Sequence, residues 1–217
     1  GYAQDLQDAM NLTHPSEVRL LLQKLEVKPN KTLGQNFLID ANILRILLRT
    51  AELRSTDVVL EIGPGLGVLT EWLLRWAGQV TAIEKDSRLC AYLRSQFQGV
   101  SNLNLVEGDA LEIDLASLLA GGVNKMVSNL PYAVGSRILV DLIDSGRRPE
   151  RIVITVQKEV AHRLTAAPGG KEYGLISVLA QLHYDIHIEK EISPTCFLPP
   201  PDVKSAIVCL ARRTRSL

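Results

Sequence analysis

The chain has 217 residues, of which 46% are hydrophobic and 22% are charged, values typical of a globular protein and not of a disordered one. No apolar run approaches the roughly 18 residues of a membrane helix, and the N-terminal residues lack the pattern of a secretory signal. Three widely spaced cysteines exclude a disulfide framework and a CxxC metal site, which favours a cytoplasmic location. Lys plus Arg and Asp plus Glu both number 24, so the charge does not indicate a general nucleic-acid-binding protein, although a local basic patch stays open.

The predicted elements begin with two helices. Ser16 is expected to cap a helix that runs to Leu25, and Asp40 a second helix with apolar residues at helical spacing. From residue 58 onward, short apolar runs alternate with helical segments. Strands are predicted at 58–62, 80–83, 103–106, 125–128 and 152–156, and helices at 66–76, 87–97, 136–143, 159–166 and 175–182. The last two strands, 184–192 and 205–210, have no helix between them, which favours an antiparallel hairpin.

Strands that alternate with helices indicate an α/β fold with right-handed crossovers and a mostly parallel sheet, closed here by an antiparallel strand. Ligands of such open sheets bind beyond the carboxyl ends of the strands. The residues at four of those ends are Gly63, Glu84, Asp109 and Asn129. We therefore expect these four residues to surround a ligand.

The first strand runs into a glycine-rich turn, Glu61 to Gly67, with the pattern G-x-G-x-G. Glycines let the backbone approach a ligand and turn a helix N-terminus toward it. The dinucleotide fingerprint requires a further glycine at the position of Val68. The turn therefore disfavours a nicotinamide oxidoreductase and favours a smaller adenosine-containing ligand, unless it serves only to pack the strand on the helix.

Two carboxylates extend this prediction. Glu84 lies about 20 residues after Gly63, where a carboxylate accepts hydrogen bonds from ribose hydroxyls. Asp109 ends the third strand and is suited to accept from the exocyclic amine of adenine. The structural alternatives are an exposed turn charge for Glu84 and a helix N-cap for Asp109.

The fourth strand ends in Asn129-Leu130-Pro131-Tyr132, which suits methylation of an exocyclic amine. The amine becomes nucleophilic when its N–H groups are held by acceptors, here the Asn129 amide oxygen and the Leu130 carbonyl. Pro131 stiffens the turn, and Tyr132 offers a face on which a base can stack. Positioning for in-line attack is then the main catalytic effect, with no strong base required. The structural alternative is an ordinary turn with a packed tyrosine.

In these motifs the sequence resembles the small-subunit ribosomal RNA adenine N6-dimethyltransferases, the KsgA family. The resemblance implies an enzyme of the Rossmann-like class I S-adenosylmethionine-dependent methyltransferase fold that dimethylates two adjacent adenosines in a hairpin loop of small-subunit RNA. The matching segments run from about residue 28 to the end of the chain. They are 33–38, 61–67, Glu84, 108–110, 129–132, 157–160, 173–174 and 197–201 with Val203 and Ser205.

The resemblance also implies roles for individual residues. Those expected to contact S-adenosylmethionine are Asn36, Leu38, Gly63, Gly65, Glu84, Asp109 and Asn129. Those expected to hold the target adenine are Asn129, Leu130 and Tyr132, with Phe197 as a second stacking face. Lys28 and Lys31, beside the loop at 35–36, are expected to contact RNA phosphates.

The expected partner is small-subunit ribosomal RNA or the small ribosomal subunit, and we expect a monomer with no membrane contact and no metal. His183 and His187 lack a third ligand for a metal site. Residues 1–27 form an N-terminal extension and helix, and 28–217 the catalytic domain. The resembling family carries a further C-terminal helical domain, so we expect this chain to be a catalytic domain that binds the cofactor but methylates ribosomal subunits slowly.

Two rival functions stay open. The first is an adenine methyltransferase of large-subunit RNA, a family that shares the cofactor motifs. The segments 173–174 and 197–201 with Ser205 resemble the small-subunit family more. The second is a non-catalytic RNA-binding relative on the same scaffold, which the intact Gly63 and Asn129–Tyr132 motif disfavour.

Overall fold

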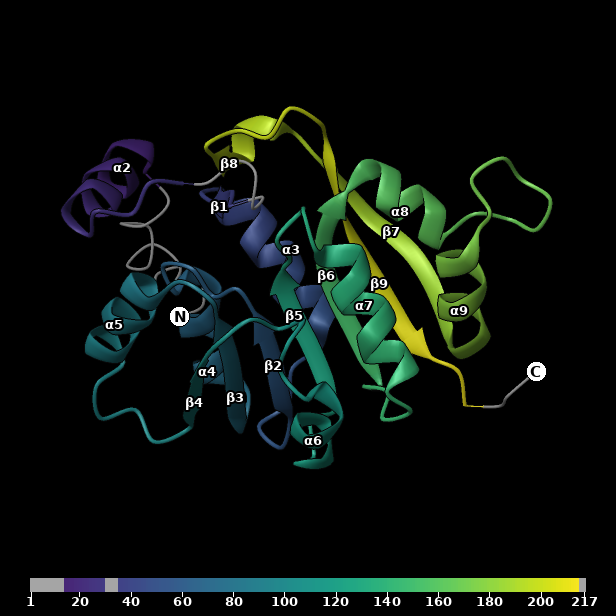
Figure 1. The fold of residues 1–217 in the computed structure, drawn as a ribbon, viewed down its shortest axis with the longest axis horizontal. Helices are drawn as coiled ribbons and strands as arrows, with labels where there is room; N and C mark the ends of the chain where they lie inside the picture. The colour runs from purple at the N-terminus through teal and green to yellow at the C-terminus, as the bar shows by residue number, and fades with distance from the viewer. Residues whose placement is uncertain (1–13, 30–34, 215–217) are drawn as a thin grey trace.

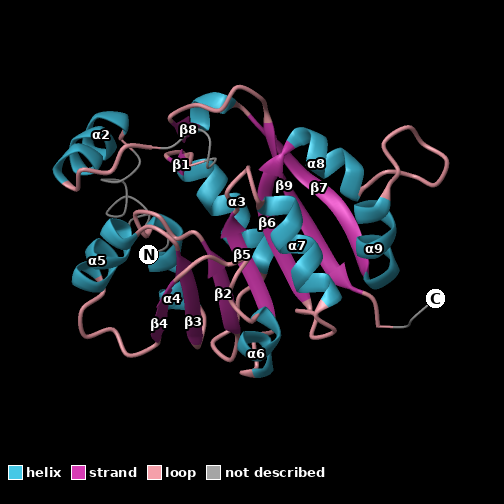
Figure 2. Cartoon of the chain, viewed as in Figure 1, coloured by secondary structure: helices cyan, strands magenta, loops and turns pink. Residues whose placement is uncertain are grey.

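A computed structural model of the protein describes residues 14–29 and 35–214. It is an α/β fold with a seven-stranded sheet in the order β4-β3-β2-β5-β6-β9-β7 and a separate pair of short strands, β1 and β8 (Figures 1 and 2). Strands β2 to β6 run parallel to one another, and β9 is antiparallel to both of its neighbours. The predicted fold class is confirmed, including the antiparallel closure.

The sheet strands are β2 (Val58–Ile62), β3 (Gln79–Glu84), β4 (Leu103–Glu107), β5 (Lys125–Asn129), β6 (Arg151–Gln157), β7 (Tyr184–Ile192) and β9 (Ser205–Arg212). The short pair is β1 (Phe37–Leu38) and β8 (Phe197–Leu198), with the 3-10 helix η3 (Pro194–Cys196) beside it. The helices are α2 (Pro15–Lys24), α3 (Ala41–Ala51), α4 (Val68–Trp76), α5 (Ser87–Gln96), α6 (Leu115–Ala120), α7 (Gly135–Asp144), α8 (Lys158–Leu164) and α9 (Leu175–His183). Every strand predicted from the apolar runs is present, with bounds that shift by two residues or less.

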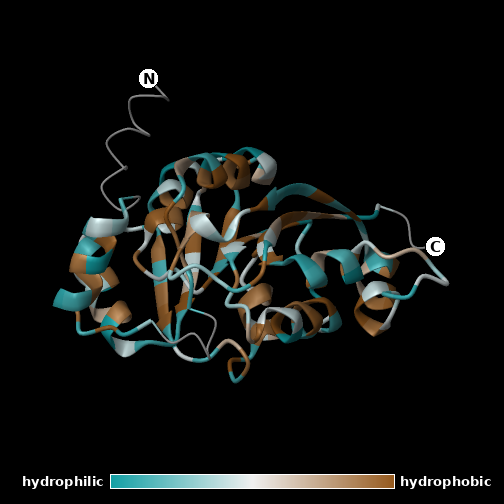
Figure 3. Ribbon diagram, turned by 90° about the horizontal axis from the view of Figure 1, so that it is seen from above, coloured by the Kyte–Doolittle hydropathy of each residue, from teal (hydrophilic) through white to brown (hydrophobic). Residues whose placement is uncertain are grey.

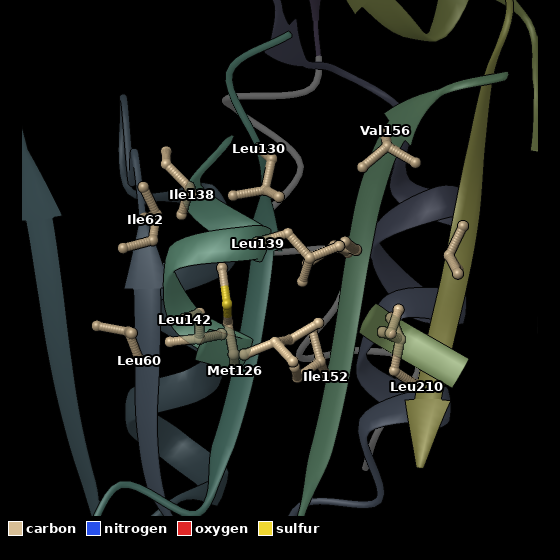
Figure 4. Close-up of a cluster of buried hydrophobic side chains, with 14 of the residues drawn as sticks. Leu60, Ile62, Met126, Leu130, Ile138, Leu139, Leu142, Ile152, Val156 and Leu210 are labelled. Carbon is tan, nitrogen blue, oxygen red and sulfur yellow. The ribbon is translucent and has the colours of Figure 1, made fainter. Parts of the chain in front are cut away.

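The hydrophobic core lies in two layers, one on each face of the sheet (Figure 3). Successive strand residues point to opposite faces, so Leu60 packs with α6 to α9 while its neighbour Val59 packs with α3 and α4. Figure 4 shows the first layer, where Leu139 and Leu142 of α7 lie over Met126 of β5. Burial on both faces explains why the central strands read as continuous apolar runs.

The predicted terminal hairpin is confirmed, because β7 and β9 pair antiparallel along nearly their whole length. Its connection contains a contact that the sequence did not predict. Strand β8 pairs with β1, with Phe37 opposite Leu198 and Leu38 opposite Phe197. This pair brings residues 197–198 beside residues 37–38, at the edge of the sheet where the parallel strands end (Figure 1).

The N-terminal helix α2 packs on the α/β fold through Val18 and Leu22, which belong to a small cluster that includes Leu66 and Leu89. The prediction that Ser16 caps this helix is wrong. The N-cap is His14, because Pro15 suits the first helical position with its fixed φ and missing N–H.

Two further local outcomes concern helices. Asp40 caps α3 as predicted, accepting from the Ile43 amide at 2.9 Å. Helix α6 was not predicted, because six residues are too few for a helical period to be recognised. Among the residues that the structure describes, no helix is both long and apolar enough to cross a membrane.

Candidate active site

A cavity of about 520 Å³ lies at the carboxyl ends of the parallel strands. Its size falls within the range of about 300–1,000 Å³ that is usual for small-ligand sites. The residues predicted at four strand ends all line it, namely Gly63, Glu84, Asp109 and Asn129. Asn36, Leu38, Gly65 and Leu130 line it as well. The structure thus brings Asn129 beside Asn36, which lies 93 positions earlier in the sequence.

The glycine turn after β2 forms one wall of the cavity. Gly63, Gly65 and Gly67 have φ values of 70°, 60° and 82°, a region that other residues rarely adopt. A Cβ atom on Gly65 would also lie 3.2 Å from the ring of Phe37, which lines the same cavity. The turn therefore needs glycine for its backbone conformation and for the space that it leaves open.

Glu84 is 5% exposed, so the alternative of an exposed turn charge is wrong. Its two carboxylate oxygens accept from the backbone N–H groups of Gly65 and Asp86, each at 3.0 Å. Burial raises the pKa of this carboxyl, and the two N–H donors oppose that rise. Each carboxylate oxygen has a second lone pair, so Glu84 can also accept from a ligand in the cavity.

Asp109 lies at the cavity edge and forms an ion pair with Lys85, with Oδ2 and Nζ 2.9 Å apart. Its other oxygen accepts from the Leu111 amide at 2.9 Å, within a turn that does not continue as an α-helix. The alternative of a helix N-cap is therefore wrong, since Asp114 caps α6 instead. The Lys85 hydrogen bond lowers the pKa of Asp109, which stays ionised near neutral pH.

Sequence reasoning missed Glu61 as a separate site residue. Its side chain lines the cavity, is 2% exposed and accepts a hydrogen bond from the Thr70 hydroxyl. Burial raises the pKa of Glu61 to about 8, with the neighbouring Glu84 charge adding to the rise. A carboxylate inside the otherwise apolar strand 58–62 is the signal that could have identified it.

Asn129 is held at both ends of its amide. Its Nδ2 donates to the backbone carbonyl of Asn36 at 3.0 Å, and its Oδ1 accepts from the Thr155 hydroxyl on β6. Asn36 in turn donates its side-chain Nδ2 to the Pro199 carbonyl at 2.6 Å. Thr155 was not predicted, because a threonine in a strand carries no distinguishing pattern. These bonds fix which amide atom faces which neighbour.

The predicted base-holding residues lie beside the cavity. Leu130 is 2% exposed, and its side chain packs in the core. The Tyr132 hydroxyl bonds to Ser205, and burial raises the pKa of this tyrosine to about 12. Its ring meets Phe197 edge-on, with centroids 6.0 Å apart. Phe197 is 1% exposed and so presents no open stacking face in this structure.

The predicted phosphate contacts are described only in part. Lys28 is exposed and lines a second cavity together with Arg19, Arg88 and Pro199. That cavity adjoins the first, since Asp86 and Arg88 line both. Lys31 lies outside the described residues. Within the described ranges, no three His, Cys, Asp or Glu side chains gather as metal ligands would.

The polar groups that line the cavity fit S-adenosylmethionine. Buried Glu84 and partly exposed Asp109 suit ribose hydroxyls and an exocyclic amine, and the glycine turn allows close approach of the ligand.

Comparison with known proteins identifies the family of this chain. The family model described as "Ribosomal RNA adenine dimethylase" matches residues 26–217. "Ribosomal RNA small subunit methyltransferase A" of Magnetococcus marinus is 43% identical over 199 residues, which cover 91% of this chain and 71% of that protein.

Two solved structures are also similar. A dimethyladenosine transferase from Plasmodium falciparum has a TM-score of 0.74 and 31% identity, with 82% of this chain and 63% of that one covered. The 23S rRNA methyltransferase ErmE has a TM-score of 0.72 and 31% identity, with 84% and 72% covered. The chain therefore belongs to the ribosomal RNA adenine dimethylase family and is an S-adenosylmethionine-dependent methyltransferase of Rossmann-like fold.

Proposed function

We propose that this enzyme transfers methyl groups to the N6 atom of adenosines in small-subunit ribosomal RNA. One observation carries the proposal: the Asn129 amide is fixed by Asn36 and Thr155 in the wall of the cavity, three residues before Tyr132. The target we propose is a pair of adjacent adenosines in a hairpin loop. Loop bases are already unstacked in part, so moving one into a pocket costs little.

The chain's own residues would hold the cofactor at the strand ends. We propose that Glu84 accepts from the ribose hydroxyls and Asp109 from the adenine amine, with Asn36, Leu38, Gly63, Gly65 and Asn129 completing the contacts. S-adenosylmethionine supplies the methyl group to be transferred. The ion pair with Lys85 holds the Asp109 carboxylate in place before the ligand binds.

Asn129 would act on the target amine through its oxygen. The bond from Nδ2 to Asn36 turns Oδ1 toward Thr155, and the second lone pair of Oδ1 is left for an N–H of the amine. The backbone carbonyl of Leu130 is the second acceptor in this proposal. Holding both N–H groups makes the nitrogen lone pair available for attack and positions it in line with the donor.

Tyr132 would stack on the target base, and its bond to Ser205 holds the ring in place. Phe197 would be the second stacking face, which requires its ring to become exposed. Because Phe197 is 1% exposed and lies edge-on to Tyr132, its ring must be uncovered when RNA binds. Without RNA it supports Tyr132 from the side.

Small-subunit RNA is favoured over large-subunit RNA as the substrate. The curated relative named for the small subunit is 43% identical to this chain and covers 91% of it. We propose that the enzyme acts as a cytoplasmic monomer. The test is to incubate the chain with S-adenosylmethionine and purified small or large subunits, then to measure dimethyladenosine in each RNA. Dimethyladenosine confined to large subunits would overturn the proposal.

A further inference from the structure

Three charged side chains outside the cofactor cavity meet at the same edge of the sheet. Lys158 begins α8, Glu191 lies near the end of β7, and Lys204 directly precedes β9. The Glu191 carboxylate bridges the two lysines, with one oxygen 3.3 Å from Lys158 Nζ and the other 3.0 Å from Lys204 Nζ. The start of α8 and the two arms of the terminal hairpin thus hold two ammonium groups around one carboxylate.

The cluster lies next to the proposed base site. Gln157 is opposite Ser205 in the β6–β9 register, and Ser205 is the hydroxyl that bonds to Tyr132. Lys158 follows Gln157, Lys204 precedes Ser205, and the Lys158 amide donates to the Lys204 carbonyl at 3.0 Å. Figure 1 shows that β6 ends and β9 begins at the edge that carries β8. Each lysine is therefore one residue away from the strand pair that supports Tyr132.

We propose that Lys158 and Lys204 form a phosphate-binding site for the RNA strand beside the nucleotide that Tyr132 holds. Glu191 holds the two ammonium groups in position until a phosphate takes its place between them. This inference rests on the proposed function and adds to it a contact for the nucleotide that flanks the target.

The charges of the cluster support an anion. The side chains of Lys158, Lys204 and Glu191 are 40%, 59% and 45% exposed, so a strand on the surface can reach them. The three charges sum to one positive charge, and the hydrogen bonds from Lys204 and Lys158 lower the pKa of Glu191, which stays ionised. Exposed ion pairs contribute little to stability, so exchanging Glu191 for a phosphate costs little.

Two further carboxylates lie close to the cluster in the sequence. Glu159 is paired with Arg163, one turn further along α8. Asp202 is exposed two residues before Lys204. Because the chain as a whole has no net charge, its attraction for a polyanion depends on local groups of this kind.

The test is the binding of small ribosomal subunits over a range of salt concentrations. For the double variant Lys158→Gln/Lys204→Gln we expect weaker binding and a slope of log affinity against log salt that is shallower by about 0.7–0.9 for each phosphate that the lysines no longer neutralise. The KM for RNA should rise while kcat and the affinity for S-adenosylmethionine stay unchanged. Arg54→Gln is the matched control, since Arg54 is exposed at the opposite edge of the sheet, before β2.

Glu191→Gln should change the affinity for RNA in the opposite direction. Removing the competing carboxylate should strengthen RNA binding if the lysines contact phosphate, whereas a purely structural ion pair predicts unchanged or weaker binding. An unchanged slope in the double variant, or unchanged or weaker binding by Glu191→Gln, would overturn the inference. The binding assay does not depend on methyl transfer, so a wild-type chain that binds RNA but never methylates it would refute only the proposed function.

Discussion

The Asn129 amide Nδ2 lies 3.0 Å from the backbone carbonyl of Asn36, 93 residues earlier in the chain. This bond joins the end of β5 to the loop before β1, two segments that line the cavity. It also fixes the orientation of the amide, and with it the position of the oxygen that we assign to the target amine. The reactivity of the site should therefore depend on this arrangement.

Replacing Asn129 should affect the reaction more than cofactor binding. We expect Asn129→Ala to lower kcat by about two orders of magnitude or more, the usual effect of removing one preorganised polar group from a reacting centre. Single-turnover methylation of small-subunit RNA measures this decrease, and calorimetry measures the affinity for S-adenosylmethionine. Thr155→Val, which removes only the hydroxyl that bonds to Asn129, should show a smaller decrease. Near wild-type turnover in Asn129→Ala would contradict the assigned role.

Glu84→Ala should weaken the binding of S-adenosylmethionine by about 1–3 kcal/mol, because the ribose hydroxyls lose their acceptor. The same change leaves the Gly65 and Asp86 N–H groups without their partner, so the glycine turn loses its support as well. Glu84→Gln keeps one oxygen as an acceptor and should be affected less. Isothermal titration calorimetry on folded protein gives both affinities, and equal affinity in the wild type and Glu84→Ala would remove the assignment.

The buried Glu61 carboxyl should make stability depend on pH. Its pKa is about 8 in the folded chain and near 4.5 when unfolded, so the folded state binds more protons in this window. The free energy of unfolding contributed by Glu61 therefore falls as pH rises from about 5 to 8. Glu61→Gln keeps an acceptor for Thr70 without this titration. The Tm of this variant should exceed that of the wild type by a margin that grows with pH, and parallel Tm profiles would disprove the effect.

Phe197→Leu should remove base stacking without unfolding the protein. Leucine keeps most of the buried volume, so the variant should fold, while Phe197→Ala would leave a cavity in a well-packed region. Removing the aromatic ring should lower kcat/KM for RNA by about 5- to 150-fold, equivalent to about 1–3 kcal/mol for one stacked base. The affinity for S-adenosylmethionine should not change. A kcat/KM close to that of the wild type would show that Phe197 only packs the core.

The elements that could be predicted well are those specified by residues close together in the sequence. Apolar runs indicated the strands, Asp40 marked the start of α3 through its own side chain, and strand ends located Glu84 and Asp109 beside the cavity. The unpredicted features depend on contacts between distant segments. The pairing of β1 with β8 joins two residues to two others about 160 positions away, and no period exists in so short a strand.

Burial likewise could not be inferred at single polar or aromatic positions. Glu84 lies in the charged segment 84–86, yet its side chain is covered because two backbone N–H groups satisfy it. Phe197 follows a loop-like sequence, yet β8 places it against Leu38 in the core. The cluster of Lys158, Glu191 and Lys204 depends on the register of β6, β9 and β7, which a sequence pattern does not specify.

The most direct test of the account is to locate dimethyladenosine by mass spectrometry in RNA from small subunits incubated with this chain and S-adenosylmethionine. A long incubation with excess enzyme allows a slow reaction to be detected. We predict N6,N6-dimethyladenosine at two adjacent positions of a small-subunit hairpin loop, present with the wild-type chain and absent with Asn129→Ala. If small-subunit RNA stays unmodified while large-subunit RNA is methylated, or if Asn129→Ala modifies the small subunit as well as the wild type does, the account is contradicted.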